Sequence, residues 1–353
     1  MSPLTLDDAR VRKILVCQLR QIGDVILTTP ALELLHRRFP GAKIHVLTEK
    51  KCLPVLEHNP HIERVWPIDK KALPNILAEL RYYWRIARER FDLVIDFQQL
   101  PRCRWVVAFS RAPYRLSYPP AWYKRPLYNI HCQPPKAYAA QQKANLLAPL
   151  GIVWQGESPK IFLTQKEREA AATALAKAGL APHQRLITVD PTHIRATRQW
   201  PEAHFAKLLD LVAEHDPDLR FLLLYGPGEE SVVAGVAELV RHKENLLDLG
   251  RMLALREMFA VQERACLHVG NCSAPRHSAV AVGTPTLTVL GATSRNWTFP
   301  SLEHQDMCLG LPCQPCNAHD CDIGIQCLRE LAPEVVFITL RDMLPAPVAP
   351  LEA

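Results

Sequence analysis

The chain has 353 residues, 48% of them hydrophobic and 22% charged, which is the balance of an ordinary soluble globular protein. This length exceeds one typical core and suits two domains of about 150 residues each. No apolar run approaches the roughly 18 residues of a membrane span, and the formal net charge of +6 is spread along the chain. Because nucleic-acid-binding proteins usually gather Lys and Arg on one face, we expect no nucleic-acid partner, and the modest excess suits an enzyme with anionic substrates.

The first half alternates short apolar runs with helical patterns, which is typical of a parallel sheet covered on both faces. Residues 1–13 carry acids before bases and no apolar stretch, so they do not resemble a secretory signal, and we expect a cytoplasmic protein. The predicted strands and helices are 13–19, 25–39 (helix), 43–48, 62–68, 73–90 (helix) and 91–97. Residues 111–138, rich in Pro, Tyr, Trp and Arg, interrupt this alternation and predict an irregular segment that lines a ligand site.

A second alternating series follows a predicted helix at 165–179. Its predicted elements are strand 185–190, helix 201–215, strand 220–226, helix 229–242, strand 245–249 and helix 255–264. We place the first domain at 1–170 and the second at 171–330, followed by a helix at 331–343. The Pro-rich tail, 344–353, is predicted to be disordered.

Residues 265–293 predict a buried strand, a tight polar turn, a short helix and a second buried strand. The turn, NCSAP, opens the helix. A helix N-terminus carries unpaired N–H groups and partial positive charge, so this turn is a candidate phosphate site. The alternative is an ordinary turn between strand and helix that binds nothing.

The first turn of the chain, Gln21-Ile22-Gly23-Asp24, contains one glycine and not G-x-G-x-x-G, and no Walker A sequence occurs. This argues against an NAD dehydrogenase and against a P-loop NTPase. Asp24 is expected at the carboxyl end of a parallel strand, where open α/β sheets bind ligands. Its carboxylate could take a proton from a hydroxyl nucleophile or simply cap the helix, and the spacing leaves both readings open.

The turn at 189–205 offers Thr192, Arg195 and Arg198 as phosphate-binding groups, with a solvated basic loop as the alternative. After the next strand, Glu229 or Glu230 could accept hydrogen bonds from ribose hydroxyls, or both acids could simply favour a helix N-terminus.

Five of the 11 cysteines crowd into residues 308–327. Four of them follow C-x2-C-x4-C-x5-C spacing: Cys313, Cys316, Cys321 and Cys327. Four thiolates can enclose zinc or iron tetrahedrally, and such a site would be structural because no position stays open for a substrate. His319 is a spare candidate ligand. The alternatives are reduced loop cysteines or disulfides, and a reducing compartment disfavours the disulfides.

Three motifs, in this order, resemble glycosyltransferase family 9, the ADP-heptose:lipopolysaccharide heptosyltransferases. They are KILVCQLRQIGDVILTTPALELLHRRFPGAKIHVLT, TRQWPEAHFAKL and VGNCSAPRHSAVAVGTPTLTVLGAT, and the resemblance covers about residues 13–340. It implies an α/β GT-B fold in which two Rossmann-like domains face a central cleft. The first would bind a lipopolysaccharide inner-core acceptor and the second ADP-heptose, and helix 331–343 would cross back to the first domain.

The resemblance also implies residue roles. Asp24, beside Gly23, would be the general base, and Arg198 would contact the donor phosphates where many members have Lys. The turn at Ser273 and Ala274 would cradle the diphosphate with His277 nearby, and Glu230 would meet the ribose. The implied reaction is a single displacement with inversion that requires no cofactor, and domain closure would exclude water.

The acceptor carries carboxylates and phosphates, so cations of the irregular segment are candidates to hold it. They are Arg111, Arg115, Lys124 and Arg125, interleaved with Tyr114, Trp122 and Tyr123. A solvated loop is the alternative. The same segment is expected to lie near the inner membrane surface, because the acceptor is lipid-anchored.

One departure from the family pattern concerns the donor sugar. Members usually have Asp where this chain has Cys272, and a thiol cannot accept two strong hydrogen bonds from sugar hydroxyls. Arg276 in the same turn adds a positive charge near the phosphates. Two alternatives therefore stay open: a GT-B transferase or epimerase that uses another nucleotide sugar, and a non-catalytic relative that binds one.

Overall fold

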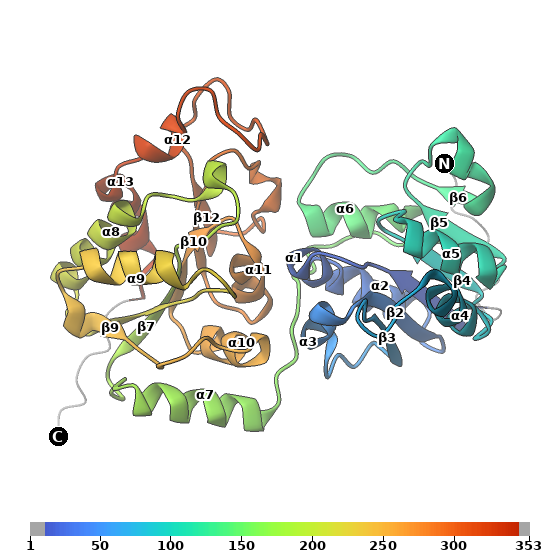
Figure 1. The fold of residues 1–353 in the computed structure, drawn as a ribbon, viewed down its shortest axis with the longest axis horizontal. Coiled ribbons are helices and arrows are strands. Elements are labelled where there is room, and N and C mark those ends of the chain that lie inside the picture. The colour runs from blue at the N-terminus through green and yellow to red at the C-terminus, as the bar shows by residue number, and fades with distance from the viewer. Residues whose placement is uncertain (1–10, 346–353) are drawn as a thin grey trace. The chain divides into compact units, whose positions relative to one another are not determined.

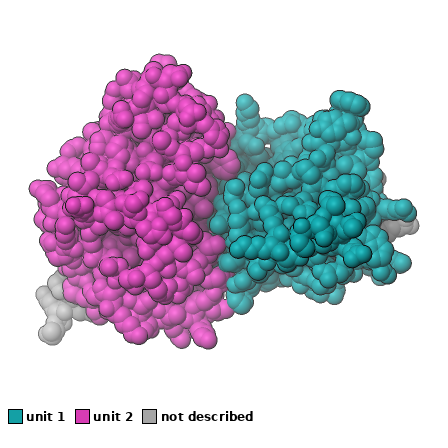
Figure 2. Space-filling view, in the orientation of Figure 1, with its two compact units in different colours: residues 1–162 teal, residues 163–353 magenta. Residues whose placement is uncertain are grey.

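The computed structural model describes residues 11–345, which divide into two compact units between Phe162 and Leu163 (Figure 2). The sequence placed this division after residue 170, within the helix that opens the second unit. Each unit is built on its own six-stranded sheet, and every pair of neighbouring strands is parallel (Figure 1). This confirms the predicted α/β class with two Rossmann-like domains.

The sheet of the first unit has the strand order β3-β2-β1-β4-β5-β6. Its strands are β1 (Lys13–Cys17), β2 (Lys43–Glu49), β3 (Arg64–Ile68), β4 (Leu93–Asp96), β5 (Tyr114–Ser117) and β6 (Ile130–His131). The chain builds outward from β1 to β3 and then crosses to β4 on the other side of β1. Ligands of open α/β sheets bind beyond the carboxyl ends of the strands at such a reversal. The turn after β1 therefore occupies the expected position of a site.

The helices of the first unit are α1 (Ile22–Ile26), α2 (Thr29–Arg38), α3 (Leu53–Leu56), α4 (Ile76–Ala87), α5 (Pro101–Ser110) and α6 (Ala139–Leu146). Short 3₁₀ turns are η2 (Lys50–Cys52), η3 (Trp122–Leu127) and η4 (Ala148–Leu150). The helix predicted at 25–39 is two helices, because α1 ends at Ile26 and α2 begins at Thr29, with Pro30 in its first turn. The predicted irregular segment contains the short strands β5 and β6 on either side of η3.

The second unit has the equivalent strand order, β12-β11-β10-β7-β8-β9. Its strands are β7 (Arg185–Asp190), β8 (Leu219–Leu223), β9 (Leu246–Leu247), β10 (Leu267–Asn271), β11 (Thr286–Val289) and β12 (His304–Met307). Here the reversal lies between β7 and β10. The two candidate donor turns, after β7 and after β10, therefore leave adjacent strands at the same edge.

The helices of the second unit are α7 (Gln165–Lys177), α8 (Glu202–His215), α9 (Glu230–Leu239), α10 (Leu255–Glu263), α11 (Ala274–Ala281), α12 (Gln326–Arg329) and α13 (Pro333–Met343). Its 3₁₀ turns are η5 (Ala196–Arg198), η6 (Lys243–Asn245) and η7 (Arg295–Trp297). Helix α13 packs on α8, and its Val336 and Leu340 are fully buried in the core of this unit. The helix that was expected to cross back thus uses its apolar face within the second unit.

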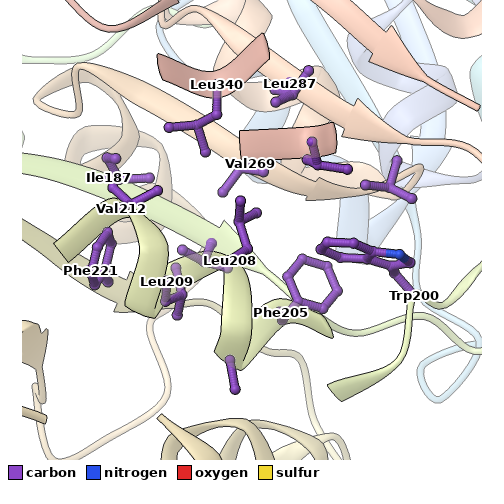
Figure 3. Packing of buried hydrophobic residues seen from close by; sticks show 14 of the residues in the cluster. Ile187, Trp200, Phe205, Leu208, Leu209, Val212, Phe221, Val269, Leu287 and Leu340 are labelled. Atoms are coloured by element: carbon purple, nitrogen blue, oxygen red, sulfur yellow. The ribbon is translucent and has the colours of Figure 1, made fainter. Parts of the chain in front are cut away.

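The core of the second unit is formed by buried apolar side chains from its sheet and from α8 and α13 (Figure 3). Trp200 and Phe205 are fully buried, with ring centroids 5.0 Å apart at an interplanar angle of 80°. The Trp200 indole N–H donates to the Leu331 carbonyl at 3.1 Å, and its backbone N–H donates to Asn271 Oδ1 at 2.9 Å. Because Asn271 ends β10, these contacts tie the loop after β7 to the neighbouring strand and to the core.

No helix among residues 11–345 is long and apolar enough to cross a membrane. The predicted disorder of 344–353 falls mainly on residues 346–353, which lie outside the described part.

Candidate active site

Asp24 lies in the first turn of α1, directly beyond β1. Its Oδ2 accepts a hydrogen bond from the Gln21 backbone N–H at 3.1 Å, which completes a capping box at the start of this five-residue helix. About one third of the side chain is exposed, at 32%. The N-cap residue is Gln21, so Asp24 caps the helix from its third position rather than as the N-cap that the sequence suggested, and its Oδ1 takes no part in this contact. Gly23 is buried in the same helical turn.

Lys143 of α6 reaches the buried side of this turn, and sequence analysis did not single it out. Its Nζ lies 3.9 Å from Asp24 Oδ1 and 3.0 Å from the Asp24 carbonyl oxygen. Burial lowers the pKa of Lys143 to about 8, and the charge of Asp24 opposes that shift. Helix α6 carries no recognisable motif, so only the folded chain reveals this neighbour.

In the second unit, a hydrogen-bonded network of polar side chains joins the turns after β7, β8 and β10. The Thr192 hydroxyl lies 3.0 Å from Asp190 Oδ1 and 2.8 Å from Glu229 Oε2. Ser273 donates its hydroxyl to Asp190 Oδ2, and the Gly226 N–H donates to Glu229 Oε2 at 2.7 Å. Thr192, Ser273 and Glu229 thus brace one another, which leaves Glu230 as the acid of this pair without a hydrogen bond or ion pair in the described part.

Asp190 is the buried centre of that network. Desolvation raises its pKa to about 7, although the hydroxyls of Ser273 and Thr192 oppose the shift. Gly270 of β10 makes room for it, because a Cβ there would lie 2.6 Å from the Asp190 carbonyl oxygen and 2.8 Å from the Asp190 Cβ. The carboxyl group therefore carries a proton for much of the time near neutral pH, which limits its repulsion of a nearby anion.

Arg198 ends η5 and carries a buried nitrogen, Nε, that finds no hydrogen-bond partner among residues 11–345. Burial and the charge of Arg195 lower the pKa of this guanidinium. The loop is held from below, because the Ala292 N–H donates to the Thr197 carbonyl at 3.0 Å and a Cβ at Gly291 would lie 2.3 Å from that carbonyl oxygen. A partly buried guanidinium on a fixed loop, with one buried nitrogen that lacks a partner, is suited to hold an anion.

Helix α11 begins at Ala274 with Ser273 as its N-cap residue, yet the Ser273 side chain does not cap the helix. The hydroxyl bonds to Asp190 instead, so the first-turn amides stay available to a ligand. His277 is buried in α11, and burial together with the charge of Arg276 lowers its pKa to about 3. The imidazole is therefore neutral, which makes it a shaping or hydrogen-bonding group rather than a cation.

Cys272 is buried between β10 and α11 beside Arg276. The Arg276 side chain is 1% exposed, and its Nη1 donates to Cys272 Sγ at 3.3 Å. Its Nη2 donates to the Thr298 hydroxyl, which in turn donates to Asp306 Oδ2 at 2.5 Å. Arg276 is thus consumed by internal contacts, and the thiol accepts the charge-assisted bond that a carboxylate would otherwise accept.

A cavity of about 300 Å³ opens beyond β8 and β9. Leu222, Leu224 and Leu247 form its apolar floor, and Glu230 and Asp248 supply carboxylates. An apolar slot with a few acceptors suits a nucleoside. Sequence analysis identified only Glu230 here, although the Leu-rich ends of both strands were a signal that could have found the rest.

The sequence of this chain matches a known protein family. The profile of Glycosyltransferase family 9 (heptosyltransferase) matches residues 80–325, which is more than half of the chain. The chain belongs to glycosyltransferase family 9.

Two curated relatives and one solved structure illustrate the likeness of this family 9 glycosyltransferase. It is 27% identical to lipopolysaccharide heptosyltransferase 1 of Pseudomonas aeruginosa over 95% of this chain and 99% of that protein. It is 25% identical to lipopolysaccharide heptosyltransferase 3 of Escherichia coli over 79% of this chain and 84% of that protein. The crystal structure of a family 9 glycosyl transferase from Veillonella parvula superposes with a TM-score of 0.82 at 22% identity, covering 97% and 98% of the two chains.

The cationic segment of this family 9 glycosyltransferase is divided in its use. Arg115 is committed to the fold, because its Nε donates to the Leu127 carbonyl at 2.8 Å and its Nη1 donates to the Ala112 carbonyl. Arg111 and Arg125 are exposed, and the Lys124 ammonium lies 5.5 Å from the centroid of the Tyr123 ring. Three of the four predicted cations therefore remain available to a ligand.

Of the alternatives left open for the cysteine cluster, the metal site finds no support: no group of three or more His, Cys, Asp or Glu among residues 11–345 is placed to hold a metal ion. Cys313 and Cys316 are exposed, whereas Cys327 opens α12 and packs into the core. The Ile325 N–H donates to Cys321 Sγ at 3.2 Å. The four cysteines are close in sequence, but they differ in environment: two are exposed, one accepts a backbone hydrogen bond and one is buried.

Proposed function

We propose that this enzyme transfers heptose from ADP-heptose to a lipopolysaccharide inner-core acceptor, with inversion at the anomeric carbon. The observation that carries the proposal is the pairing of Arg198, whose buried Nε lacks a partner, with the uncapped first turn of α11. Both groups lie at the carboxyl ends of adjacent strands, near a cavity suited to a nucleoside. A nucleoside diphosphate joined to a sugar matches this set of groups.

The donor would bind with its base in the cavity beyond β8 and β9 and its ribose hydroxyls at Glu230. Its diphosphate would meet Arg198 and the backbone N–H groups of Ala274 and Arg276 in the first turn of α11, which would stabilise the leaving group as it gains charge. Thr192 would also contact the donor phosphates, with its side chain positioned by hydrogen bonds to Asp190 and Glu229. These groups supply leaving-group stabilisation from fixed donors of the chain, and no step of the proposal passes through a metal or cofactor.

The acceptor would bind to the first unit with its reactive hydroxyl at Asp24. In a single displacement, the hydroxyl oxygen forms a bond to the anomeric carbon as the bond to the ADP oxygen breaks. Asp24 takes the hydroxyl proton, and the electron pair leaves with ADP. The exposed Arg111 and Arg125, with the partly buried Lys124, would hold the acidic groups of the acceptor.

The substitution at the sugar side favours a second candidate, a donor other than ADP-heptose. Cys272 stands where the family usually has Asp, and its sulfur is engaged by Arg276 at 3.3 Å. A different nucleotide sugar, used by a transferase or an epimerase, would suit a site without that carboxylate. A relative that binds a nucleotide sugar without turnover is the remaining alternative.

One assay separates these candidates. Purified enzyme is incubated with a truncated inner-core acceptor and, in parallel, with ADP-heptose and a panel of ADP- and UDP-sugars. We expect product only with ADP-heptose, with an anomeric configuration by NMR opposite to that of the donor. Transfer from another sugar would establish the second candidate, isomerised donor would indicate an epimerase, and tight binding without product would indicate a non-catalytic relative.

Peripheral contact with the cytoplasmic face of the inner membrane is part of this proposal. Helices α4 and α5 pack together and expose Ile76, Leu77, Trp84 and Trp105. The Arg88 guanidinium lies 4.6 Å from the centroid of the Trp84 ring, so aromatic and cationic groups share this face. Co-sedimentation with vesicles should require anionic lipid, and equal binding to neutral vesicles would contradict the electrostatic part.

A further inference from the structure

Lys143 places a charged group in a fully enclosed position behind Asp24. The side chain is 8% exposed, and its Nζ has three close oxygen neighbours. They are Gln18 Oε1 at 2.6 Å, the Asp24 carbonyl oxygen at 3.0 Å and Thr28 Oγ1 at 3.0 Å. An ammonium has three donors, so its hydrogen-bonding capacity is filled by neutral groups. The compensating negative charge comes from the Asp24 carboxylate, 3.9 Å away.

The three oxygen atoms belong to successive parts of the turn that carries Asp24. Gln18 directly follows β1, Asp24 lies in α1, and Thr28 precedes α2. The Thr28 hydroxyl also donates to the Asp24 carbonyl at 2.8 Å. Lys143 comes from α6, more than a hundred residues further along the chain. One ammonium therefore fixes the backbone on both sides of Asp24 from a separate element.

The other titratable groups near Asp24 do not direct a positive charge at its carboxylate. Tyr118, after β5, has its pKa raised to about 12 by burial and by Asp24. Cys52 of η2 has its pKa raised to about 11, chiefly by burial. Lys51 directs its ammonium to Gln21 Oε1 at 2.7 Å. Among the ion pairs of the described residues, Lys143 is the cation that faces the Asp24 carboxylate.

We infer that Lys143 is a positioning residue for catalysis: its ammonium locks α1 onto the end of β1 and holds Asp24 as an aligned carboxylate, ready to accept a proton. This rests on the proposed role of Asp24 as the general base. The burial cost of an ammonium is large, and an apolar side chain would fill the same space at lower cost. A charge retained in this position is therefore explained by what it does to the carboxylate beside it.

The charge should appear in the pH dependence of transfer. Removing a cation that lies 3.9 Å from the Asp24 carboxylate removes an attraction that favours its charged form, so the acid limb of the kcat–pH profile should move upward in variants without the ammonium. The wild-type enzyme should also lose activity as Lys143 releases its proton near pH 8. A role limited to packing would change neither limb.

The experiment compares Lys143→Met, Lys143→Gln and Lys143→Arg with the wild type, and uses Lys160→Met as the matched control. Lys160 lies in the same unit, and its ammonium forms an ion pair with Glu33 at 2.9 Å rather than with Asp24. We expect Lys143→Met and Lys143→Gln to lower kcat by about 10- to 100-fold and to shift the acid limb. Lys143→Arg should keep a charge at all accessible pH values and move the alkaline limb upward. Donor KM and the Lys160→Met profile should stay unchanged.

Two results would overturn the inference. The first is an unchanged pH profile in Lys143→Met and Lys143→Gln with kcat lowered only in proportion to the folded fraction, measured by circular dichroism. The second is an unchanged alkaline limb in Lys143→Arg, which keeps the test decisive if the neutral variants fail to fold. Lys143→Gln in an Asp24→Asn background separates the two hypotheses. No further loss of residual activity supports action through Asp24, whereas full activity of Asp24→Asn alone would refute the proposed general base itself.

Discussion

The two units place different electrostatic arrangements at the same topological point. In the first, the turn after β1 presents Asp24 with a buried cation 3.9 Å behind it. In the second, the turns after β7 and β10 present Arg198, whose Nε has no partner, and uncapped amides. Both positions lie where strand order reverses. The comparison teaches that one fold positions a site, while the charges packed beneath each turn decide whether it offers a base or an anion receptor.

The most severe disruption of this comparison should come from Asp24→Asn. The amide keeps the shape and the capping contact but cannot accept the hydroxyl proton, so kcat should fall about 10²- to 10⁴-fold. ADP affinity, measured by calorimetry, should stay unchanged because the second unit is intact. Glu63→Gln, which removes a surface ion pair with Lys43, is the control for loss of a carboxylate in the first unit. Normal turnover in Asp24→Asn would remove Asp24 from the mechanism.

Next in size is Arg198→Ala, which removes the anion-binding guanidinium from the second unit. Loss of a hydrogen bond to a charged group costs about 1.5–3 kcal/mol, so the Kd for ADP should rise roughly 10- to 100-fold. Calorimetry measures this directly, with Arg341→Ala as the control because its side chain only pairs with Asp342 on α13. Equal affinity in the variant and the wild type would place Arg198 outside the donor site.

The third prediction concerns Asp190, the buried aspartate of the second unit, in contrast to the partly exposed Asp24 of the first. The pKa of Asp190 is raised to about 7, well above its ordinary value, so its proton stabilises the fold below the ordinary pKa of an aspartate and this contribution is lost as pH rises towards 7. Asp190→Asn mimics the protonated form. We expect equal unfolding free energies at low pH and a variant more stable by on the order of 2 kcal/mol at pH 8. Denaturant unfolding at pH 5 and pH 8 tests this, and a pH-independent difference would contradict it.

The smallest expected effect is that of Cys272→Asp, which restores the usual family residue beside Arg276. A carboxylate there can accept hydrogen bonds from sugar hydroxyls, so kcat/KM for ADP-heptose should rise by about fivefold, equivalent to roughly 1 kcal/mol. Cys272→Ser is the control for loss of the thiol alone. A fall in kcat/KM for ADP-heptose with a parallel fall for every other nucleotide sugar would show that the site is not tuned at this position.

The elements that sequence analysis predicted well are those whose signal is local. Alternating apolar strands and helices predicted most of both sheets, and the S-A-P turn predicted where α11 begins, whereas α1 begins at Ile22, within the residues predicted as a turn. Strand β12, with the sequence HQDM, was missed because it is a short polar edge strand. The helix predicted at 25–39 is divided next to Pro30, which has no N–H to continue the helical hydrogen bonds and therefore lies in the first turn of a new helix.

Features that depend on distant parts of the chain were out of reach. Lys143 and Asp24 meet across 119 positions, and no periodicity in α6 indicates that a lysine is buried there. The four cysteines show the same limit, because their spacing was compatible with a bound metal ion, with reduced loop cysteines and with disulfides, and could not decide between them. The fold instead assigns Cys327 to the core and leaves Cys313 and Cys316 exposed. Motif spacing predicts which residues are near one another, but only tertiary packing decides their direction.

The hydrogen bond from the Trp200 amide to Asn271 has a consequence for how donor preference can diversify. This bond connects the turn after β7 to the end of β10, and the buried Trp200 ring anchors the connection in the core. A change in the backbone of either turn alone would break this hydrogen bond. Cys272 follows Asn271 directly. A substitution at this one position would change the group that faces the donor sugar and would leave the backbone of both turns unchanged. New donor specificities in such a protein should arise from side-chain substitutions on an unchanged backbone, rather than from longer or reoriented loops.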